Sequence, residues 1–191
     1  GSGMRDDALG YGISWHERAP YEVLTTDWLS YGDVLLLKGV EDMVEVYYNS
    51  RQFDRTIEKI MEQYASPFLF FKELADFYDR EGLAGIGHAR IARYEILRRF
   101  LSEEKGWDLK SYDQCMVLDL YARENLKSRP AFAPDLSPYK EQLKAMTREY
   151  GRQVHVEVLE QEQGSVYLMF DYRIRDPLTG DARMQILEEA K

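Results

Sequence analysis

The side chains best suited to chemistry are few in this chain and lie far apart. The histidines His16, His88 and His155 have no second histidine or cysteine at metal-ligand spacing, so the sequence predicts no zinc or metalloprotease site. The single cysteine, Cys115, lies in an apolar run and is expected to be a buried structural thiol. One cysteine also excludes an internal disulfide framework and an all-cysteine iron–sulfur site within this chain.

A glycine-rich segment, residues 82–87, precedes a predicted helix. It follows a helix rather than a strand, so it is neither a dinucleotide-binding fingerprint nor a phosphate-binding loop. One interpretation is an anion site at the start of the next helix, formed by Gly85, Gly87, His88 and Arg90. The alternative is an interhelical turn whose glycines supply positive φ angles.

Five carboxylates are candidates for catalytic groups. Glu41 and Glu45 lie four residues apart on the first predicted helix, where a solvated helix face is preferred to a catalytic pair. Asp113 and Asp119 are not at helical spacing, and we expect both to lie on a solvated helix face. Asp171 lies between two aromatic residues of a predicted strand. For this carboxylate, a structural hydrogen bond to a loop or an ion pair with Arg173 or Arg175 is preferred to catalysis.

Aromatic residues gather around the N-terminal arm and the first predicted helix, where they form the best functional candidate. Tyrosine and tryptophan are typical anchors of protein interfaces. The set is either a docking face for a preceding domain or a substrate, or the place where the arm packs on the first helix. Its members, with one neighbouring asparagine, are Trp15, Tyr21, Trp28, Tyr31, Tyr47, Tyr48 and Asn49.

The composition excludes several classes of protein. A net charge of −9 argues against a nucleic-acid surface. The basic stretch from Arg90 to Arg99 is expected to be a solvated helix face or an ion-paired interdomain face. There is no apolar run long enough for a transmembrane helix and no signal peptide, so a cytoplasmic location is the expectation. Residues 1–3 look like a cloning remnant and are left out of the fold prediction.

Hydrophobic spacing predicts helices over most of the chain, after an extended arm at residues 5–28. Ser30 and Asp33 form an expected capping box at the first helix, and Ser66 with Pro67 marks the start of the third. The apolar run at residues 68–71 is expected to lie in the middle of the core. The predicted helices cover residues 31–48, 51–65, 67–81, 85–104, 109–126 and 138–150.

The apolar spacing then changes to every second residue, which is typical of strands. Strands are predicted at residues 154–158, 166–172 and 182–188, with turns at Gln163-Gly164 and at residues 176–181. Together these patterns predict an α+β fold, a mostly helical bundle of about six helices with a small C-terminal three-stranded antiparallel sheet. The expected organisation is a remnant and arm at 1–28 and a single domain at 29–191, helical over 30–151 and a β meander over 152–188.

Four short segments carry a resemblance to a known family. They are Ala19-Pro20-Tyr21-Glu22-Val23-Leu24, Trp28-Leu29-Ser30-Tyr31, Leu37-Lys38-Gly39-Val40-Glu41 and Tyr47-Tyr48-Asn49-Ser50. The chain resembles a C-terminal domain of unknown function that follows cobalamin-binding and radical SAM domains in bacterial proteins. The similarity is clearest from Tyr11 to Arg51 and weaker as far as residues 167–172.

The resemblance implies a larger parent enzyme. Its neighbouring domains would hold an iron–sulfur cluster and S-adenosylmethionine, with cobalamin as a further candidate, and no cofactor is expected in this chain. Nothing here matches the Cys-x₃-Cys-x₂-Cys loop that such barrels need, so no catalytic or metal residue is carried over.

The sequence therefore favours a non-catalytic accessory domain that docks on the catalytic barrel or gates it. Its partners would be the preceding radical SAM and cobalamin-binding domains, with no nucleic acid and no membrane. The alternatives are a small-molecule or substrate-binding module and a protein–protein adaptor. An independent enzyme is the least favoured interpretation.

Overall fold

The computed structural model describes residues 3–161 and 164–187, and the chain divides into two units. Unit 1 comprises the residues up to Val46 together with Ser66–Ile86, and unit 2 comprises Tyr47–Ala65 and the residues from Gly87 onward. This division does not follow the expected boundary at residue 28. That residues 29–191 form one domain stays a prediction.

Unit 1 begins with short elements and continues into two long helices. The elements are α1 (Gly3–Asp6), the 3-10 turn η1 (Ala8–Tyr11), strands β1 (Ser14–Trp15) and β2 (Val23–Thr25), α2 (Tyr31–Val44) and α4 (Pro67–Arg80). The prediction that residues 5–28 are extended is therefore wrong before residue 12. There, main-chain bonds from Asp7 N–H to Gly3 and from Gly10 N–H to Asp7 close helical turns.

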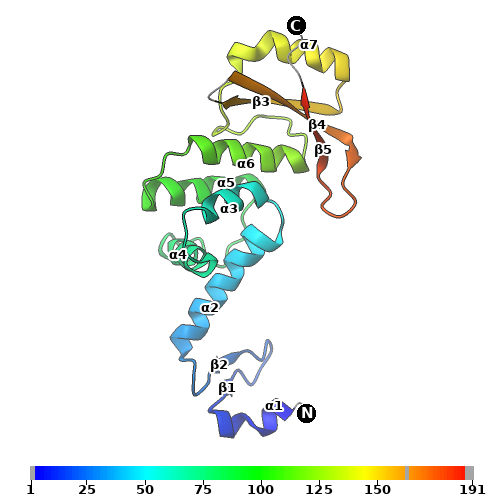
Figure 1. Cartoon of the computed structure of the whole chain (residues 1–191). Helices are drawn as coiled ribbons and strands as arrows, with labels where there is room; N and C mark the ends of the chain where they lie inside the picture. Colours follow the sequence, from blue (N-terminus) through cyan, green and yellow to red (C-terminus); the bar gives the residue numbers. More distant parts are fainter. Residues whose placement is uncertain (1–2, 162–163, 188–191) are drawn as a thin grey trace. The chain divides into compact units, whose positions relative to one another are not determined.

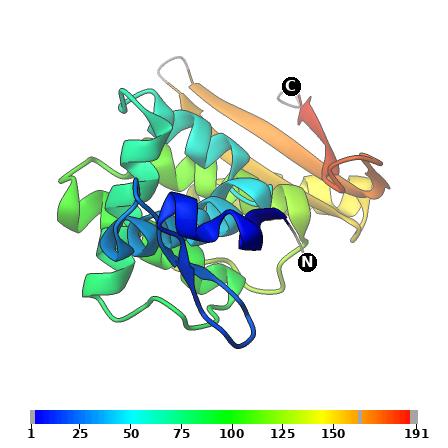
Figure 2. The same ribbon diagram turned by 90° about the horizontal axis from the view of Figure 1, so that it is seen from below.

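The two strands of unit 1 form an antiparallel hairpin, in which Ser14 lies opposite Thr25 and Trp15 lies opposite Val23. The loop between the strands extends away from α1 (Figure 2). The hairpin continues into the capping box of α2, which is confirmed. Ser30 Oγ accepts a bond from Asp33 N–H at 3.2 Å, and the Asp33 carboxylate accepts one from Ser30 N–H at 2.9 Å.

Helices α2 and α4 approach closely where Gly39 lies. A Cβ atom at this position would be 3.3 Å from the Cβ of Ala75, which is tight for carbon atoms in contact. The prediction that the whole apolar start of α4 is buried is wrong in part. Phe70 and Phe71 are buried, whereas Phe68 and Leu69 are nearly half exposed, because successive residues of a helix point to different sides.

Unit 2 contains the remaining elements, drawn from cyan to red in Figure 1. They are the π-helical turn η2 (Glu45–Asn49, which begins in unit 1), α3 (Asp54–Met61), α5 (Arg90–Arg99), the π-helical turn η3 (Phe100–Glu104), α6 (Lys110–Arg123), the 3-10 turn η4 (Ser137–Tyr139), α7 (Lys140–Tyr150), β3 (Val154–Gln161), β4 (Gly164–Arg175) and β5 (Ala182–Leu187). The α+β class, with helices α2–α7 and a three-stranded antiparallel sheet in the order β3-β4-β5, is confirmed.

The predicted helix at residues 85–104 begins only at Arg90. The segment before it contains Gly82 and Gly85 at φ angles of 65° and 70°, which glycine adopts without steric cost but which interrupt a right-handed helix. The glycine-rich segment thus behaves as an interhelical turn. The strand turn predicted at Gln163-Gly164 and the end of the last strand at residue 188 lie partly outside the described residues.

The sheet of unit 2 is covered on both faces. Helix α7 lies on one side of it and α6 on the other (Figure 1). The first face packs Val154, Val156 and Val158 with Met146 of α7, and the second packs Leu168 and Phe170 with Val117 and Tyr121 of α6. Two covered faces explain why β4 has an almost continuous apolar run. They also bury Glu157 and partly bury His155, the polar residues of β3 that alternate with its valines.

Candidate functional site

The hairpin of unit 1 and the start of α2 expose a group of aromatic side chains. Trp28 is 72% exposed, Tyr21 66% and Tyr31 51%. Trp15 is partly covered at 36% exposure, and Tyr11 lies beside Trp28 with ring centroids 5.7 Å apart. We call Tyr11, Trp15, Tyr21, Trp28 and Tyr31 the aromatic surface. Isolated exposed apolar residues need no explanation, but several aromatic rings on one small segment are typical of an interaction site.

Local bonds hold the aromatic surface in place. The Thr26 hydroxyl accepts main-chain bonds from Trp28 at 3.2 Å and Leu29 at 3.0 Å, which fixes the turn that carries Trp28. An ion pair between Glu22 and Lys38 joins the flank of β2 to α2. The aromatic rings are therefore presented on ordered backbone, which reduces the entropy cost of binding.

Tyr21 adopts a left-handed backbone conformation, with φ at 53°. Such a conformation costs a non-glycine residue about 1–2 kcal/mol. An exposed tyrosine held at this cost is an observation that favours a functional role for the tip of the hairpin.

The other predicted interface residues belong to unit 2 and behave differently. Tyr47 is fully buried, packs against Phe53 at 4.8 Å between ring centroids, and donates a 3.0 Å hydrogen bond to the Arg93 carbonyl. It is a core residue and not part of an exposed surface. Tyr48 is 53% exposed and Asn49 is also exposed. The structure therefore does not join all seven residues into one surface within a unit.

The four residues of the predicted anion site are divided in the same way. Gly85 belongs to unit 1, whereas Gly87, His88 and Arg90 belong to unit 2. Arg90 forms an ion pair with Glu124, so its charge is neutralised within unit 2. The basic stretch of α5 is ion-paired elsewhere too, since Arg98 contacts Asp113 at 2.7 Å and Arg99 contacts Glu103 at 3.4 Å.

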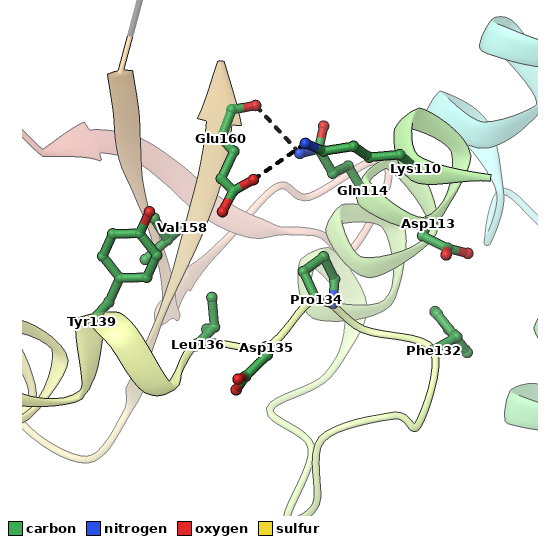
Figure 3. A pocket seen from close by; sticks show the side chains of 10 residues that line it. All are labelled: Lys110, Asp113, Gln114, Phe132, Pro134, Asp135, Leu136, Tyr139, Val158 and Glu160. Atoms are coloured by element: carbon green, nitrogen blue, oxygen red, sulfur yellow. Dashed lines mark hydrogen bonds and ion pairs between the residues drawn. The ribbon is translucent and has the colours of Figure 1, made fainter. Parts of the chain in front are cut away.

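A polar pocket of about 270 Å³ opens in unit 2 between the start of α6, the loop before η4 and strand β3 (Figure 3). Its polar lining consists of Lys110, Asp113, Gln114, Asp135, Tyr139 and Glu160. Its apolar lining consists of Phe132, Pro134, Leu136 and Val158. A concave site with apolar walls and a few polar groups is the usual form of a small-molecule site.

Two contacts join α6 to β3 at the rim of this pocket, as Figure 3 shows. Lys110 Nζ lies 3.3 Å from Glu160 Oε2, and the Gln114 side-chain amide donates to the Glu160 carbonyl at 3.4 Å. The Tyr139 hydroxyl is fixed by a 2.8 Å hydrogen bond with Ser165. The Tyr139 hydroxyl therefore has a defined position in the pocket.

A buried ionic cluster fastens the loop that forms one wall of the pocket. The Arg129 guanidinium donates to both oxygens of Glu157, at 2.8 and 2.6 Å, and also to the Pro134 carbonyl at 3.0 and 2.8 Å. His155 Nε2 lies 2.9 Å from Glu157 Oε2, and its ring stacks on Tyr121 with centroids 3.5 Å apart. The side chain of Glu157 is only 1% exposed.

Burial acts to raise the pKa of Glu157, but the hydrogen bonds from Arg129 and His155 outweigh it and lower that pKa below its usual value. The carboxylate is thus held ionised and paired. The sequence patterns missed this cluster, because Arg129 and Glu157 are 28 residues apart. The one signal was a glutamate alternating with valines in an apolar strand.

The remaining buried carboxylates are also structural. Asp119 accepts bonds from Thr56 N–H at 2.9 Å, from Thr56 Oγ1 at 2.8 Å and from Arg55 N–H at 3.1 Å, and so caps the start of α3. The expectation that Asp113 and Asp119 are solvated is wrong, because they are 9% and 3% exposed. The predicted pairing of Asp171 is confirmed with Arg173, at 2.7 and 2.8 Å.

Cys115 lies partly buried on α6, and burial raises the pKa of its thiol, which disfavours the reactive thiolate. Within the part of the chain that the structure describes, no three His, Cys, Asp or Glu side chains are grouped to hold a metal ion. Across those same residues, no helix combines the length and apolar character that crossing a membrane requires.

The fold and these sites define the class: an α+β protein with an exposed aromatic surface, a polar pocket and buried carboxylates that cap or fasten its elements. A family model described as "Protein of unknown function (DUF4080)" matches residues 10–172. The match covers most of the chain, which therefore belongs to this family. Neither the curated proteins nor the solved structures gave a match.

Proposed function

We propose that this chain is a non-catalytic accessory domain of a radical SAM and cobalamin-binding protein, and that it docks on the catalytic barrel or gates it. The family match supports the resemblance of residues 11–51 to an uncharacterised domain. The link to radical SAM chemistry comes from that resemblance alone. The cluster, S-adenosylmethionine and any cobalamin would be bound by the neighbouring domains.

The exposed aromatic surface is the observation that carries this proposal. Trp28 and Tyr21 are among its most exposed rings. The backbone of Trp28 is fixed by a hydrogen bond to Thr26, and the backbone of Tyr21 is held at a strained φ angle. Truncating a central aromatic anchor of an interface typically costs about 2 kcal/mol or more. The buried carboxylates fit the same proposal, since each has a structural partner within its own unit.

The test is to supply the cobalamin-binding and radical SAM domains as a separate chain and to measure association by calorimetry. We expect micromolar or tighter binding, and a loss of about 30-fold in Kd for Trp28→Ala or Tyr21→Ala. Leu178→Ala is the control, because Leu178 is 95% exposed but lies far from the aromatic surface in sequence. Absence of binding, or equal binding by all three variants and the parent, would refute docking through this surface.

The polar pocket favours a second candidate function, a small-molecule or substrate-binding module. Its volume of about 270 Å³ lies just below the range of drug-sized sites, so it suits a small metabolite. The pocket lies within unit 2, and the aromatic surface lies within unit 1. The two functions can therefore be tested separately.

A further inference from the structure

We propose that the polar pocket of unit 2 binds a small organic cation, a primary amine attached to a short apolar or aromatic body. This inference rests on the second candidate function and is independent of docking. It follows from three properties of the lining: the excess of negative charge, the weakness of the single ion pair at the rim, and the aromatic and aliphatic walls.

The lining contains three carboxylates, Asp113, Asp135 and Glu160, but one cation, Lys110. Asp113 is already neutralised, because Arg98 contacts both of its oxygens, at 2.7 and 3.2 Å. The charges available to a ligand are therefore those of Asp135, Glu160 and Lys110. Their sum is negative, which favours a cationic ligand over an anionic one.

Asp135 is fixed as an ionised acceptor. Its Oδ1 atom accepts bonds from the Ser137 hydroxyl at 2.6 Å and from the Ser137 main-chain N–H at 2.9 Å. These bonds lower the pKa of Asp135. Since both bonds end on Oδ1, the orientation of the carboxylate is set before any ligand arrives.

Glu160 can exchange its partner. The side chains of Lys110 and Glu160 are 68% and 56% exposed, and an ion pair this exposed contributes only about 0–1 kcal/mol. A ligand ammonium can therefore replace the Lys110 ammonium beside Glu160 at little cost. In this arrangement Lys110 competes with the ligand, so its removal should strengthen binding.

The apolar and aromatic lining of the pocket determines the size and polarity of the ligand body that it can hold. Phe132, Pro134, Leu136 and Val158 form the apolar lining, and the Tyr139 ring is held by its bond to Ser165. Aromatic faces attract cations as well as apolar groups. The volume of about 270 Å³ limits the ligand to one ring or a short aliphatic chain.

The experiment compares three probes of one shape and different charge: 2-phenylethylamine, 3-phenylpropanoate and 2-phenylethanol. Each is titrated into the full chain at low ionic strength, with binding followed by calorimetry and by amide NMR shifts at the pocket. We expect the amine to bind with a Kd of about 1 mM or below, and at least fivefold more tightly than the carboxylate.

Two variants test the role of each charge. Glu160→Gln should weaken binding of the amine about fivefold, and Lys110→Met should strengthen it by about the same factor. Glu141→Gln and Lys144→Met are matched controls, because these residues form a comparable exposed ion pair at 2.9 Å on α7 that does not line the pocket. Both controls should bind the amine as the parent does.

Tighter binding of the carboxylate, together with weaker binding in Lys110→Met, would overturn the amine inference while supporting a ligand-binding module. No pocket shifts with any probe at about 10 mM would overturn both. Neither result would bear on docking, which is measured through Trp28 and Tyr21.

Discussion

Replacing Arg129 with methionine should lower the free energy of unfolding at pH 7 by about 3 kcal/mol. The change removes two contacts to Glu157 and two to the Pro134 carbonyl, and leaves a carboxylate that is 1% exposed with His155 as its remaining polar contact. Breaking a buried ion pair by removing one partner costs about 3–5 kcal/mol. Because Arg129 itself is 27% exposed, we expect the lower end of that range.

The double variant Arg129→Met/Glu157→Gln should recover part of this loss, because it no longer buries an unpaired charge. The assay is urea unfolding of the four proteins of the double-mutant cycle, with the coupling energy as the result. Arg99→Met is the control, because its ion pair with Glu103 at 3.4 Å is exposed on both sides. We expect this control to lose less than about 1 kcal/mol.

The pH dependence gives a second readout with a defined sign. The folded-state pKa of Glu157 is lowered, so its contribution to stability is present above the unfolded-state pKa and is lost as the pH falls through the folded-state value. In Arg129→Met the same carboxylate is buried without its main partner, so its pKa should be raised. The stability of the two proteins should therefore converge as the pH is lowered from 7 towards 4.

A loss below about 1 kcal/mol for Arg129→Met, with a coupling energy near zero, would refute this reasoning. It would mean that water or a rearranged loop satisfies Glu157 without the guanidinium. A penalty that stays constant between pH 7 and pH 4 would contradict the electrostatic origin of the effect, since loss of packing alone does not depend on pH.

Three further changes should alter stability by amounts that urea unfolding can measure. Asp119→Ala removes the cap of α3 and leaves its first N–H groups without an acceptor. We expect the free energy of unfolding to fall by about 2–3 kcal/mol. A fall of less than about 0.5 kcal/mol would contradict the capping role. Ser30→Ala breaks the capping box of α2 and should cost about 1 kcal/mol, whereas Ser30→Asp should largely restore the cap. Gly39→Leu should cost about 1–3 kcal/mol by forcing α2 and α4 apart at Ala75, while Gly32→Ala, with more room around it, should not.

The sequence predicted most elements because their signals are local. The capping box of Ser30 and Asp33 joins residues three positions apart, and the strand pattern from Val154 to Val158 needs only alternate residues. The errors arose where a local pattern was extended too far. The helix predicted from residue 85 begins at Arg90, because Gly85 has a positive φ angle and Ala89, just before the helix, is extended.

The candidate sites depended on contacts that no local pattern carries. Tyr47 and Trp28 are both aromatic residues of the family-like segment, yet one is fully buried and the other 72% exposed. Asp119 was expected on a solvated helix face because charged side chains outside a pocket are usually solvated. It is buried because α3, about 64 positions earlier in the chain, presents its unpaired N–H groups to it.

By itself the sequence determined the α+β class, the approximate limits of helices α2–α7 and the three strands, because periodicity and capping act within a few residues. Only the tertiary structure decided that the sheet has two covered faces, that Arg129 fastens a loop to Glu157, and that a polar pocket lies beside this loop. The hydrogen bonds of this loop and pocket join residues 26 to 46 positions apart. Their energies come from burial and paired charge, which exist only once the distant segments have come together.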